Sequence, residues 1–293
     1  MATTDDIRRA VQSGWGRDPD EVLPHDTGMN SRTWQVRLAD RRYVAKLVPA
    51  WERQHLIGGL AAATVVDRAG IPAGDPLPTR DGRTVADIAD GALALLADVA
   101  GRELVGDDPA EQSMIGSTLA RAHLALDGVD LPGAERFHWI DPRAAHLGVA
   151  GWVRPAIAAA LDAYGAIPPA SLTWGPLHSD PAPEAFLQDG LAGACGLIDW
   201  DRALVGPRMY DVASAVMYVG GPGRADALLA AYVAAGGLPG AEVARALAPM
   251  LRMRWAVQAD YFARRIAADD RTGIADPAEN AEGLEDARRE LSR

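Results

Sequence analysis

The chain has 293 residues, 29 basic and 40 acidic, which gives a formal net charge of −11 and a pI near 5.0. This acidic composition excludes a general nucleic-acid binder, which needs a basic surface to neutralise phosphates. Hydrophobic residues make up 48% and charged residues 24%, which excludes a disordered chain, and no apolar run is long enough to span a membrane.

The polar N-terminus has no apolar signal-peptide core, and a single cysteine cannot form an internal disulfide. We therefore expect a cytoplasmic protein with neither a nucleic-acid nor a membrane partner. Cys195 lies in an apolar run, so we expect it to be a small buried core residue.

Residues 1–97 predict a small β-rich lobe. Residues 33–38 and 43–48 alternate polar and apolar side chains around a short turn, which predicts an antiparallel hairpin. Pro49 ends the second strand, and an alanine-rich helix is expected over 56–69. The other elements expected in this lobe are a helix over 6–13 and strands over 84–88 and 92–97.

From residue 98 onward the pattern becomes mainly helical and predicts a larger second lobe over 98–293. Short strands return near its middle, where residues 185–188 and 194–198 flank the tight turn Asp189-Gly190 and predict a second hairpin. The helices of this lobe are expected over 110–126, 151–164, 207–219, 225–235, 243–269 and 278–291. The predicted class is therefore α+β.

The second hairpin should bring two aspartates together. Asp180 precedes its first strand and Asp199 follows its second, so both should lie at its open end. Two carboxylates in this position suit one base and one metal ligand. Lys46, in the middle of an apolar strand, must reach solvent or meet an anion such as a phosphate. The loop around Gly28 has backbone amides that are able to cover phosphates.

Together these motifs resemble the aminoglycoside phosphotransferase and eukaryotic-like kinase superfamily. The resemblance covers most of the chain and rests on the order and spacing of motifs that are each weak alone. They are Gly28-Met-Asn-Ser, Val-Ala-Lys46-Leu, Leu93-Ala-Leu-Leu, Leu119-Ala-Arg-Ala-His123, His178-x-Asp180, Ile198-Asp199-Trp-Asp201 and Gly206-Pro-x-x-Tyr-Asp211. The resemblance implies a bilobal protein-kinase-like fold and an enzyme that uses Mg²⁺ with ATP or GTP.

The resemblance also implies roles for the matched residues. Asp180 corresponds to the catalytic aspartate that accepts or orients the proton of the acceptor hydroxyl. Asp199 corresponds to the aspartate that holds magnesium on the nucleotide phosphates. Lys46 corresponds to the lysine that contacts the α- and β-phosphates.

Three further residues are expected at the nucleotide. Leu95 lies in the connector that the resemblance places beside the purine. Asn30 and Ser31 lie in the glycine loop, where they either contact phosphate or form a polar loop tip.

The catalytic loop departs from the superfamily pattern His-Gly-Asp-x-His-x-x-Asn. Ser179 replaces the glycine, Ala182 replaces the second histidine, and Ala185 replaces the asparagine that normally binds a metal ion. Because alanine offers no oxygen ligand, we expect Glu184 or Asp201 to supply the missing one.

The helix glutamate that pairs with the strand lysine in this superfamily is also missing. Its position falls on Ile57, and Glu52 is the only acidic residue nearby. The sequence leaves open whether Glu52, another group or the phosphates alone hold Lys46.

Several other polar residues have expected positions. We expect Asp211 to cap or anchor the catalytic loop, His178 to orient it through hydrogen bonds, and His123 to be a core histidine. In the superfamily, late helices of the large lobe line the acceptor pocket. The candidates for this role here, each with a core-facing alternative, are Trp255, Asp260, Tyr261 and Arg264.

The predicted function is transfer of the γ-phosphate of ATP or GTP to a hydroxyl of a small molecule. An antibiotic acceptor, modified in resistance or self-protection, is the leading hypothesis. The net charge would suit a cationic aminoglycoside, whereas the altered catalytic loop suggests a nucleoside antibiotic. The alternatives are a metabolite kinase of the homoserine or choline type and a non-catalytic nucleotide-binding protein, which the retention of Asp180 and Asp199 disfavours.

Overall fold

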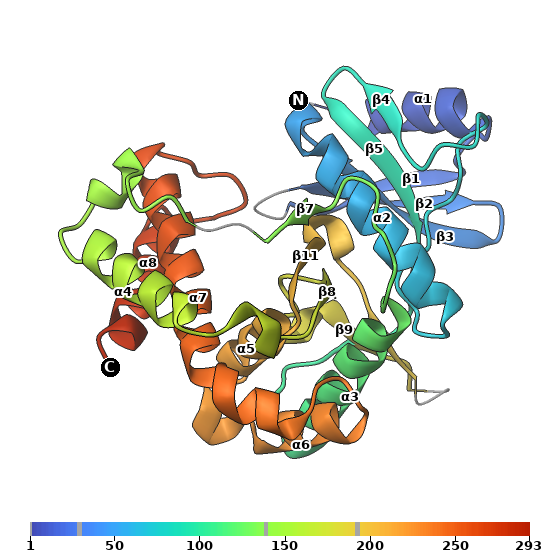
Figure 1. The fold of residues 1–293 in the computed structure, drawn as a ribbon. Helices are drawn as coiled ribbons and strands as arrows, with labels where there is room; N and C mark the ends of the chain where they lie inside the picture. The colour runs from blue at the N-terminus through green and yellow to red at the C-terminus, as the bar shows by residue number, and fades with distance from the viewer. Residues whose placement is uncertain (1, 28–30, 138–139, 191–193) are drawn as a thin grey trace.

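A five-stranded antiparallel sheet forms the centre of the N-terminal lobe in the computed structural model, which describes residues 2–293 except 28–30, 138–139 and 191–193 (Figure 1). In spatial order the strands are β1 (Glu21–Thr27), β2 (Arg32–Leu38), β3 (Arg41–Val48), β5 (Gly91–Ala97) and β4 (Ala86–Ile88). The predicted hairpin is β2 and β3, with Thr33 opposite Lys46.

Helices cover both faces of this sheet. On one face α1 (Thr4–Trp15), which begins with a capping box between Thr3 and Asp6, buries its apolar side together with Trp34. On the other face α2 (Arg53–Arg68) follows the short 3₁₀ turn η1 (Ala50–Glu52). Alternate residues of β3 therefore face opposite helices, and Lys46 lies on the α2 side.

The C-terminal lobe is mainly helical. Its helices are α3 (Pro109–Ala125), α4 (Val153–Gly165), α5 (Met209–Tyr218), α6 (Asp226–Ala234), α7 (Gly240–Ala267) and α8 (Ala278–Leu291). The long helix α7 packs against α4, α5 and α8, while α3 packs against α6. Figure 1 shows α4, α7 and α8 together on the side of the molecule away from the N-terminal sheet.

Two small sheets lie in this lobe. In spatial order, the first consists of β10 (Cys195–Leu197), β9 (Phe186–Gln188) and β6 (Arg102–Glu103). The second consists of β7 (Glu135–Arg136), β11 (Leu204–Pro207) and β8 (Trp174–Leu177). Strands β9 and β10 are the predicted second hairpin, with Phe186 opposite Leu197. This register puts the segments that contain Asp180 and Asp199 at the same end of the hairpin.

The α+β class and the two lobes are as predicted, but some elements differ. Strand β1 was not predicted, because Pro24, His25 and Asp26 interrupt its alternation; it is an edge strand with an irregular register after Pro24. Helix α2 begins at Arg53, three residues before the predicted start at 56. The start predicted at 207 for the next helix belongs to β11, and α5 begins at Met209.

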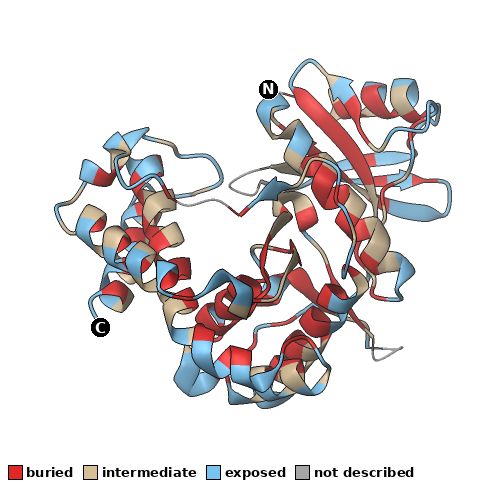
Figure 2. Cartoon of the chain, in the orientation of Figure 1, coloured by how far each residue is buried: buried red, intermediate tan, exposed pale blue. Residues whose placement is uncertain are grey.

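Figure 2 shows buried residues running along β5, through α2 and into α5 and α7. Cys195 is buried, as predicted, and belongs to the large core of the C-terminal lobe. None of the described helices is both long and apolar enough to cross a membrane.

Candidate active site

A cavity of about 440 Å³, which we call the central cavity, lies between the two lobes. Val44 and Lys46 of β3 line it from the N-terminal lobe, and Asp180, Ile198 and Asp199 line it from the C-terminal lobe. The predicted lysine and both predicted aspartates therefore face one space.

Asp211 holds the backbone of the predicted catalytic loop, residues 178–185, on the side that faces the core of the C-terminal lobe. This carboxylate is fully buried and accepts hydrogen bonds from the backbone N–H groups of His178 (2.7 Å) and Ser179 (2.8 Å). It also accepts from Nε2 of the buried His123 at 2.9 Å, whose Nδ1 lies 2.7 Å from the hydroxyl of Tyr232. Asp211 is thus the anchor of the loop, and His123 is a core histidine, as predicted.

Ser179 explains why the superfamily pattern has glycine at this position. Its backbone has a φ of +74°, the left-handed region that side chains with a Cβ rarely adopt. The serine hydroxyl donates to the carbonyl of Arg202 at 2.6 Å, and this bond holds the loop to the segment after Asp199. The loop therefore keeps the glycine-like turn with a serine side chain.

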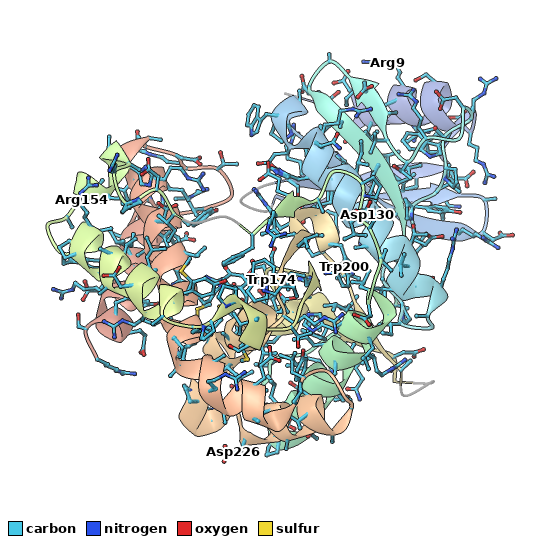
Figure 3. The ribbon with its side chains drawn as sticks, viewed as in Figure 1. Arg9, Asp130, Arg154, Trp174, Trp200 and Asp226 are labelled. Atoms are coloured by element: carbon cyan, nitrogen blue, oxygen red, sulfur yellow. The ribbon has the colours of Figure 1, made fainter. Side chains whose placement is uncertain are left out.

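His178 joins the same two segments, as predicted. Its Nε2 donates to the carbonyl of Ile198 at 2.7 Å, and its ring lies edge-on to Trp200 with centroids 4.7 Å apart. Trp200, which is labelled near the centre of Figure 3, donates from Nε1 to the carbonyl of Leu197 at 2.7 Å. Asp199, two residues after the end of β10, adopts φ +73°, and its side chain is 61% exposed and lines the central cavity.

Asp180 contacts two donors that the sequence analysis did not identify. The hydroxyl of Tyr218 donates to its Oδ1 at 2.6 Å, and Nη2 of Arg254 donates to the same oxygen at 3.1 Å. Partial burial raises the pKa of Tyr218, and the Asp180 carboxylate adds to this, so the hydroxyl stays protonated and donates. The one available signal was that Arg254 lies four residues after Met250 on the apolar side of a predicted helix.

Lys46 is held by two carboxylates from the C-terminal lobe. Its Nζ contacts Asp199 and lies 3.0 Å from Oδ2 of Asp201. Burial alone would lower the pKa of Lys46, but the two carboxylates outweigh this and raise it. The lysine in turn holds the pKa of Asp199 well below its ordinary value, whereas burial raises the pKa of Asp201.

The sequence left open whether Glu52, another group or the phosphates alone hold Lys46, and in the structure the partners are Asp199 and Asp201 and not Glu52. Glu52 accepts from Nδ1 of His55 at 2.8 Å and lies 3.3 Å from the guanidinium of Arg202. Helix α2 lies so close to the segment at Trp200–Arg202 that a Cβ on Gly59 would stand 2.0 Å from the carbonyl oxygen of Trp200. Asp201, which extends from that segment, takes the position beside the lysine instead.

Three of the predicted nucleotide contacts have different outcomes. Ser31 lines the central cavity. Asn30 lies outside the described residues. The prediction that Leu95 contacts the nucleotide is wrong for its side chain, which faces the α1 side of β5 and is fully buried there. Leu96, on the opposite face of the strand, lines the central cavity.

The predicted metal ligands also differ in their surroundings. All three line the central cavity, and Lys46 contacts both Asp199 and Asp201. Asp199 and Glu184 are exposed, whereas the Asp201 side chain is only 11% exposed. Among the described residues, no group of three or more His, Cys, Asp or Glu side chains is arranged to hold a metal ion. One or two carboxylates nevertheless fit Mg²⁺ in a nucleotide site, because phosphate oxygens and water complete its octahedron.

A second cavity, of about 660 Å³, opens beside the first and shares Ser31 with it; we call it the outer cavity. Trp51 lines it from the N-terminal lobe and is 78% exposed. Tyr261 and Arg264 line it from α7, with the guanidinium 5.8 Å from the ring centroid.

Not every late-helix candidate lines this cavity. Asp260 contacts His146 at 2.7 Å, and Trp255 packs against the core of the C-terminal lobe.

Comparisons with known proteins bear on the family and the fold. The profile described as "Phosphotransferase enzyme family" matches residues 21–247. No curated protein matches the chain significantly.

Solved structures match over nearly the whole chain. An amicoumacin kinase in complex with AMP-PNP and Ca²⁺ is 16% identical, with a TM-score of 0.77 over 99% of this chain and 93% of that one. A microcompartment-associated aminopropanol kinase is 17% identical, with a TM-score of 0.73 over 99% and 96%. A spectinomycin phosphotransferase is 11% identical, with a TM-score of 0.69 over 99% and 98%. The fold is therefore the bilobal, kinase-like fold that the sequence predicted.

Proposed function

The chain belongs to the phosphotransferase enzyme family, and from this premise we propose that it transfers the γ-phosphate of ATP or GTP to a hydroxyl of a small molecule in a Mg²⁺-dependent reaction. The observation that carries the proposal is that Lys46, Asp180 and Asp199 line one cavity between the lobes.

We assign roles to the residues that line the central cavity from their positions. Asp180 orients the acceptor hydroxyl and accepts its proton, Lys46 neutralises charge on the nucleotide phosphates, and Leu96 contacts the base. Phosphoryl transfer asks for little covalent chemistry, so positioning and charge neutralisation supply most of the rate. The complete anchor at Asp211 supports a catalytic loop over a non-catalytic remnant.

Asp199 is the proposed principal ligand of Mg²⁺, with Glu184 as the second oxygen donor in place of the missing asparagine. A metal ion held by these two carboxylates would supply positive charge that offsets the charge developing on the nucleotide phosphates. Asp201 is a poorer candidate than the sequence suggested. Lys46 contacts both aspartates, but the Asp201 side chain is only 11% exposed, whereas that of Asp199 is 61% exposed.

The acceptor is proposed to enter the outer cavity. Four arginines line it, Arg32, Arg202, Arg264 and Arg265, against three carboxylates, Glu52, Asp90 and Asp270. Two of these carboxylates already pair with arginines, Glu52 with Arg202 and Asp270 with Arg265. Such a wall disfavours a polycationic aminoglycoside.

An antibiotic acceptor with few positive charges and a flat face fits this wall better. The exposed Trp51 and the half-buried Tyr261 offer ring surfaces on which a nucleobase or similar group stacks. The amicoumacin kinase and the spectinomycin phosphotransferase support an antibiotic substrate by analogy of fold. The role would be resistance or self-protection in the cytoplasm.

A metabolite kinase is the second candidate. The aminopropanol kinase matches the chain nearly as well as the amicoumacin kinase, with TM-scores of 0.73 and 0.77. A small amino alcohol would leave most of the 660 Å³ outer cavity unfilled, which favours the larger acceptor.

The test is mass spectrometry of candidate acceptors incubated with the protein, Mg²⁺ and ATP or GTP. The panel includes nucleoside antibiotics, aminoglycosides, other sugar-bearing antibiotics, choline and homoserine. We expect a gain of one phosphoryl group on a nucleoside or other weakly charged antibiotic, and a strongly reduced yield of that product with the Asp180→Asn variant. A protein that neither binds nucleotide nor modifies any acceptor would contradict the proposal.

A further inference from the structure

We propose that Arg254 is a positioning residue for phosphoryl transfer: with Tyr218 it fixes one oxygen of the Asp180 carboxylate, so that the other oxygen faces the acceptor hydroxyl. This inference rests on the proposed function, because it takes Asp180 as the residue that orients the hydroxyl.

Arg254, Tyr218 and Asp180 form a network of hydrogen bonds. Nη2 of Arg254 donates to Oδ1 of Asp180 at 3.1 Å and lies 3.1 Å from the Tyr218 hydroxyl, which itself donates to the same Oδ1 at 2.6 Å. On its other side the guanidinium donates from Nε to Oγ of Ser214 at 2.9 Å. The guanidinium carbon also lies 5.5 Å from the centroid of the Tyr218 ring.

The two ends of this ion pair differ in burial. The Arg254 side chain is 8% exposed, whereas the Asp180 side chain is 55% exposed and lines the central cavity. A buried guanidinium is stable only when its donors are paired, so this arginine has few alternative positions. Ser214 and Tyr218 belong to α5, and Arg254 belongs to α7, which packs against α5. A loop carboxylate is thereby tied to two packed helices.

The attachment leaves one oxygen available. Oδ1 receives both donors, and no donor among the described residues contacts Oδ2 of Asp180. Fixing Oδ1 restricts rotation of the carboxylate and sets the direction of Oδ2. In-line transfer is sensitive to this direction, since a misplacement of about 1 Å can cost roughly 100-fold in rate.

The composition of the loop explains why support comes from outside it. Ala182 and Ala185 stand where the superfamily pattern has histidine and asparagine, and both are buried without a polar side chain. The loop's own side chains therefore supply no hydrogen bond at these positions. Tyr218 and Arg254 supply polar contacts to the aspartate from α5 and α7.

The test is a double-mutant cycle on Asp180→Asn and Arg254→Gln. The reaction followed is phosphate release from Mg·ATP without an acceptor, and transfer to any acceptor that the mass-spectrometry panel identifies. We expect Arg254→Gln to lower kcat about 100-fold while the KM for nucleotide changes less than about twofold. In the Asp180→Asn background the same substitution should cause no further loss, because the residue it positions is already gone. Tyr218→Phe should lower kcat about 10-fold, since one of the two donors remains.

Arg208→Gln is the matched control. Arg208 is also a buried arginine that forms an ion pair, with Asp127 at 2.7 Å, but among the described residues its guanidinium contacts none that is assigned to the site. Its loss should lower the melting temperature and leave kcat unchanged.

The outcomes separate the two proposals. Equal losses from Arg254→Gln in both Asp180 backgrounds, in proportion to lost stability, would overturn the positioning role alone. A wild-type protein that neither binds nor turns over nucleotide would overturn the proposed function, and the role of Arg254 with it.

Discussion

The carboxylates on the two sides of the predicted catalytic loop differ in burial and in hydrogen bonding. Beneath the loop, Asp211 has no exposed surface and accepts three hydrogen bonds, from His123 and from the backbone of His178 and Ser179. On the cavity side, the side chains of Asp180 and Asp199 are 55% and 61% exposed. The buried side therefore sets the shape of the loop, and the cavity side keeps oxygen lone pairs available for ligands. Substitutions on the two sides should consequently be distinguishable by what they change.

The largest effect on turnover is expected on the cavity side. Asp180→Asn should lower phosphoryl transfer about 10²- to 10⁴-fold, because under the proposed function the acceptor hydroxyl loses the group that orients it and accepts its proton. Binding of Mg·nucleotide should persist in this variant. Asp199→Asn should lower both transfer and Mg·nucleotide affinity, which calorimetric titration with AMP-PNP and Mg²⁺ measures. Near-wild-type turnover in both variants would contradict the assignment of the site.

The largest effect on stability is expected beneath the loop. Asp211→Ala removes the acceptor of a buried histidine and of two backbone N–H groups, and should cost about 3–5 kcal/mol of unfolding free energy. Denaturant unfolding measures this directly. Asp226→Ala is the control, because Asp226 is an exposed residue in the first turn of α6, labelled at the lower edge of Figure 3. It should cost less than about 1 kcal/mol. Equal losses in the two variants would show that the buried anchor does not hold the loop.

The contrast between the two sides also separates what the sequence could and could not predict. Asp180 and Asp199 were identifiable because a short hairpin must bring its ends together. Asp211 was identifiable because the resemblance to the superfamily includes its motif. Leu95 was wrong by a single residue, since adjacent residues of a strand face opposite sides of the sheet.

Contacts between elements that are distant in the sequence leave little signal in the sequence itself. Arg254 lies 74 positions after Asp180, and a lone arginine in a helix normally indicates a solvated face. The replacement of Glu52 by Asp201 beside Lys46 depends on how closely α2 approaches Trp200, which no local pattern records. Such contacts follow from packing between helices and loops that are distant in the sequence.

Substitutions of Asp201 and Glu52 test which carboxylate supports Lys46. Asp201→Asn removes a carboxylate 3.0 Å from the buried Lys46, so the lysine loses part of its support and the KM for nucleotide should rise about tenfold. Glu52→Gln should leave the nucleotide KM unchanged, because Glu52 contacts His55 and Arg202 instead. Steady-state kinetics with varied ATP compares the two variants. A larger rise in Glu52→Gln than in Asp201→Asn would contradict the pairing seen in the structure.

The smallest expected effect concerns His55, which ties α2 to the C-terminal lobe. Its Nδ1 lies 2.8 Å from Glu52 and its Nε2 lies 3.2 Å from Glu135 of β7. Burial alone would lower the pKa of His55, but the hydrogen bonds to these two carboxylates outweigh it and raise the pKa.

A raised pKa in the folded state means that protonation of His55 favours folding. The contribution should be fully present below the unfolded-state pKa of about 6.5 and should be lost as the pH rises through the higher folded-state value. Melting temperatures between about pH 6 and about pH 8.5 measure it, and His55→Gln should reduce the decline over this range. Glu135→Gln should reduce it partially, because one of the two carboxylates remains. An identical decline of the melting temperature in the wild type, His55→Gln and Glu135→Gln would show that the pH dependence arises elsewhere. His55 would then not stabilise the contact between α2 and the C-terminal lobe.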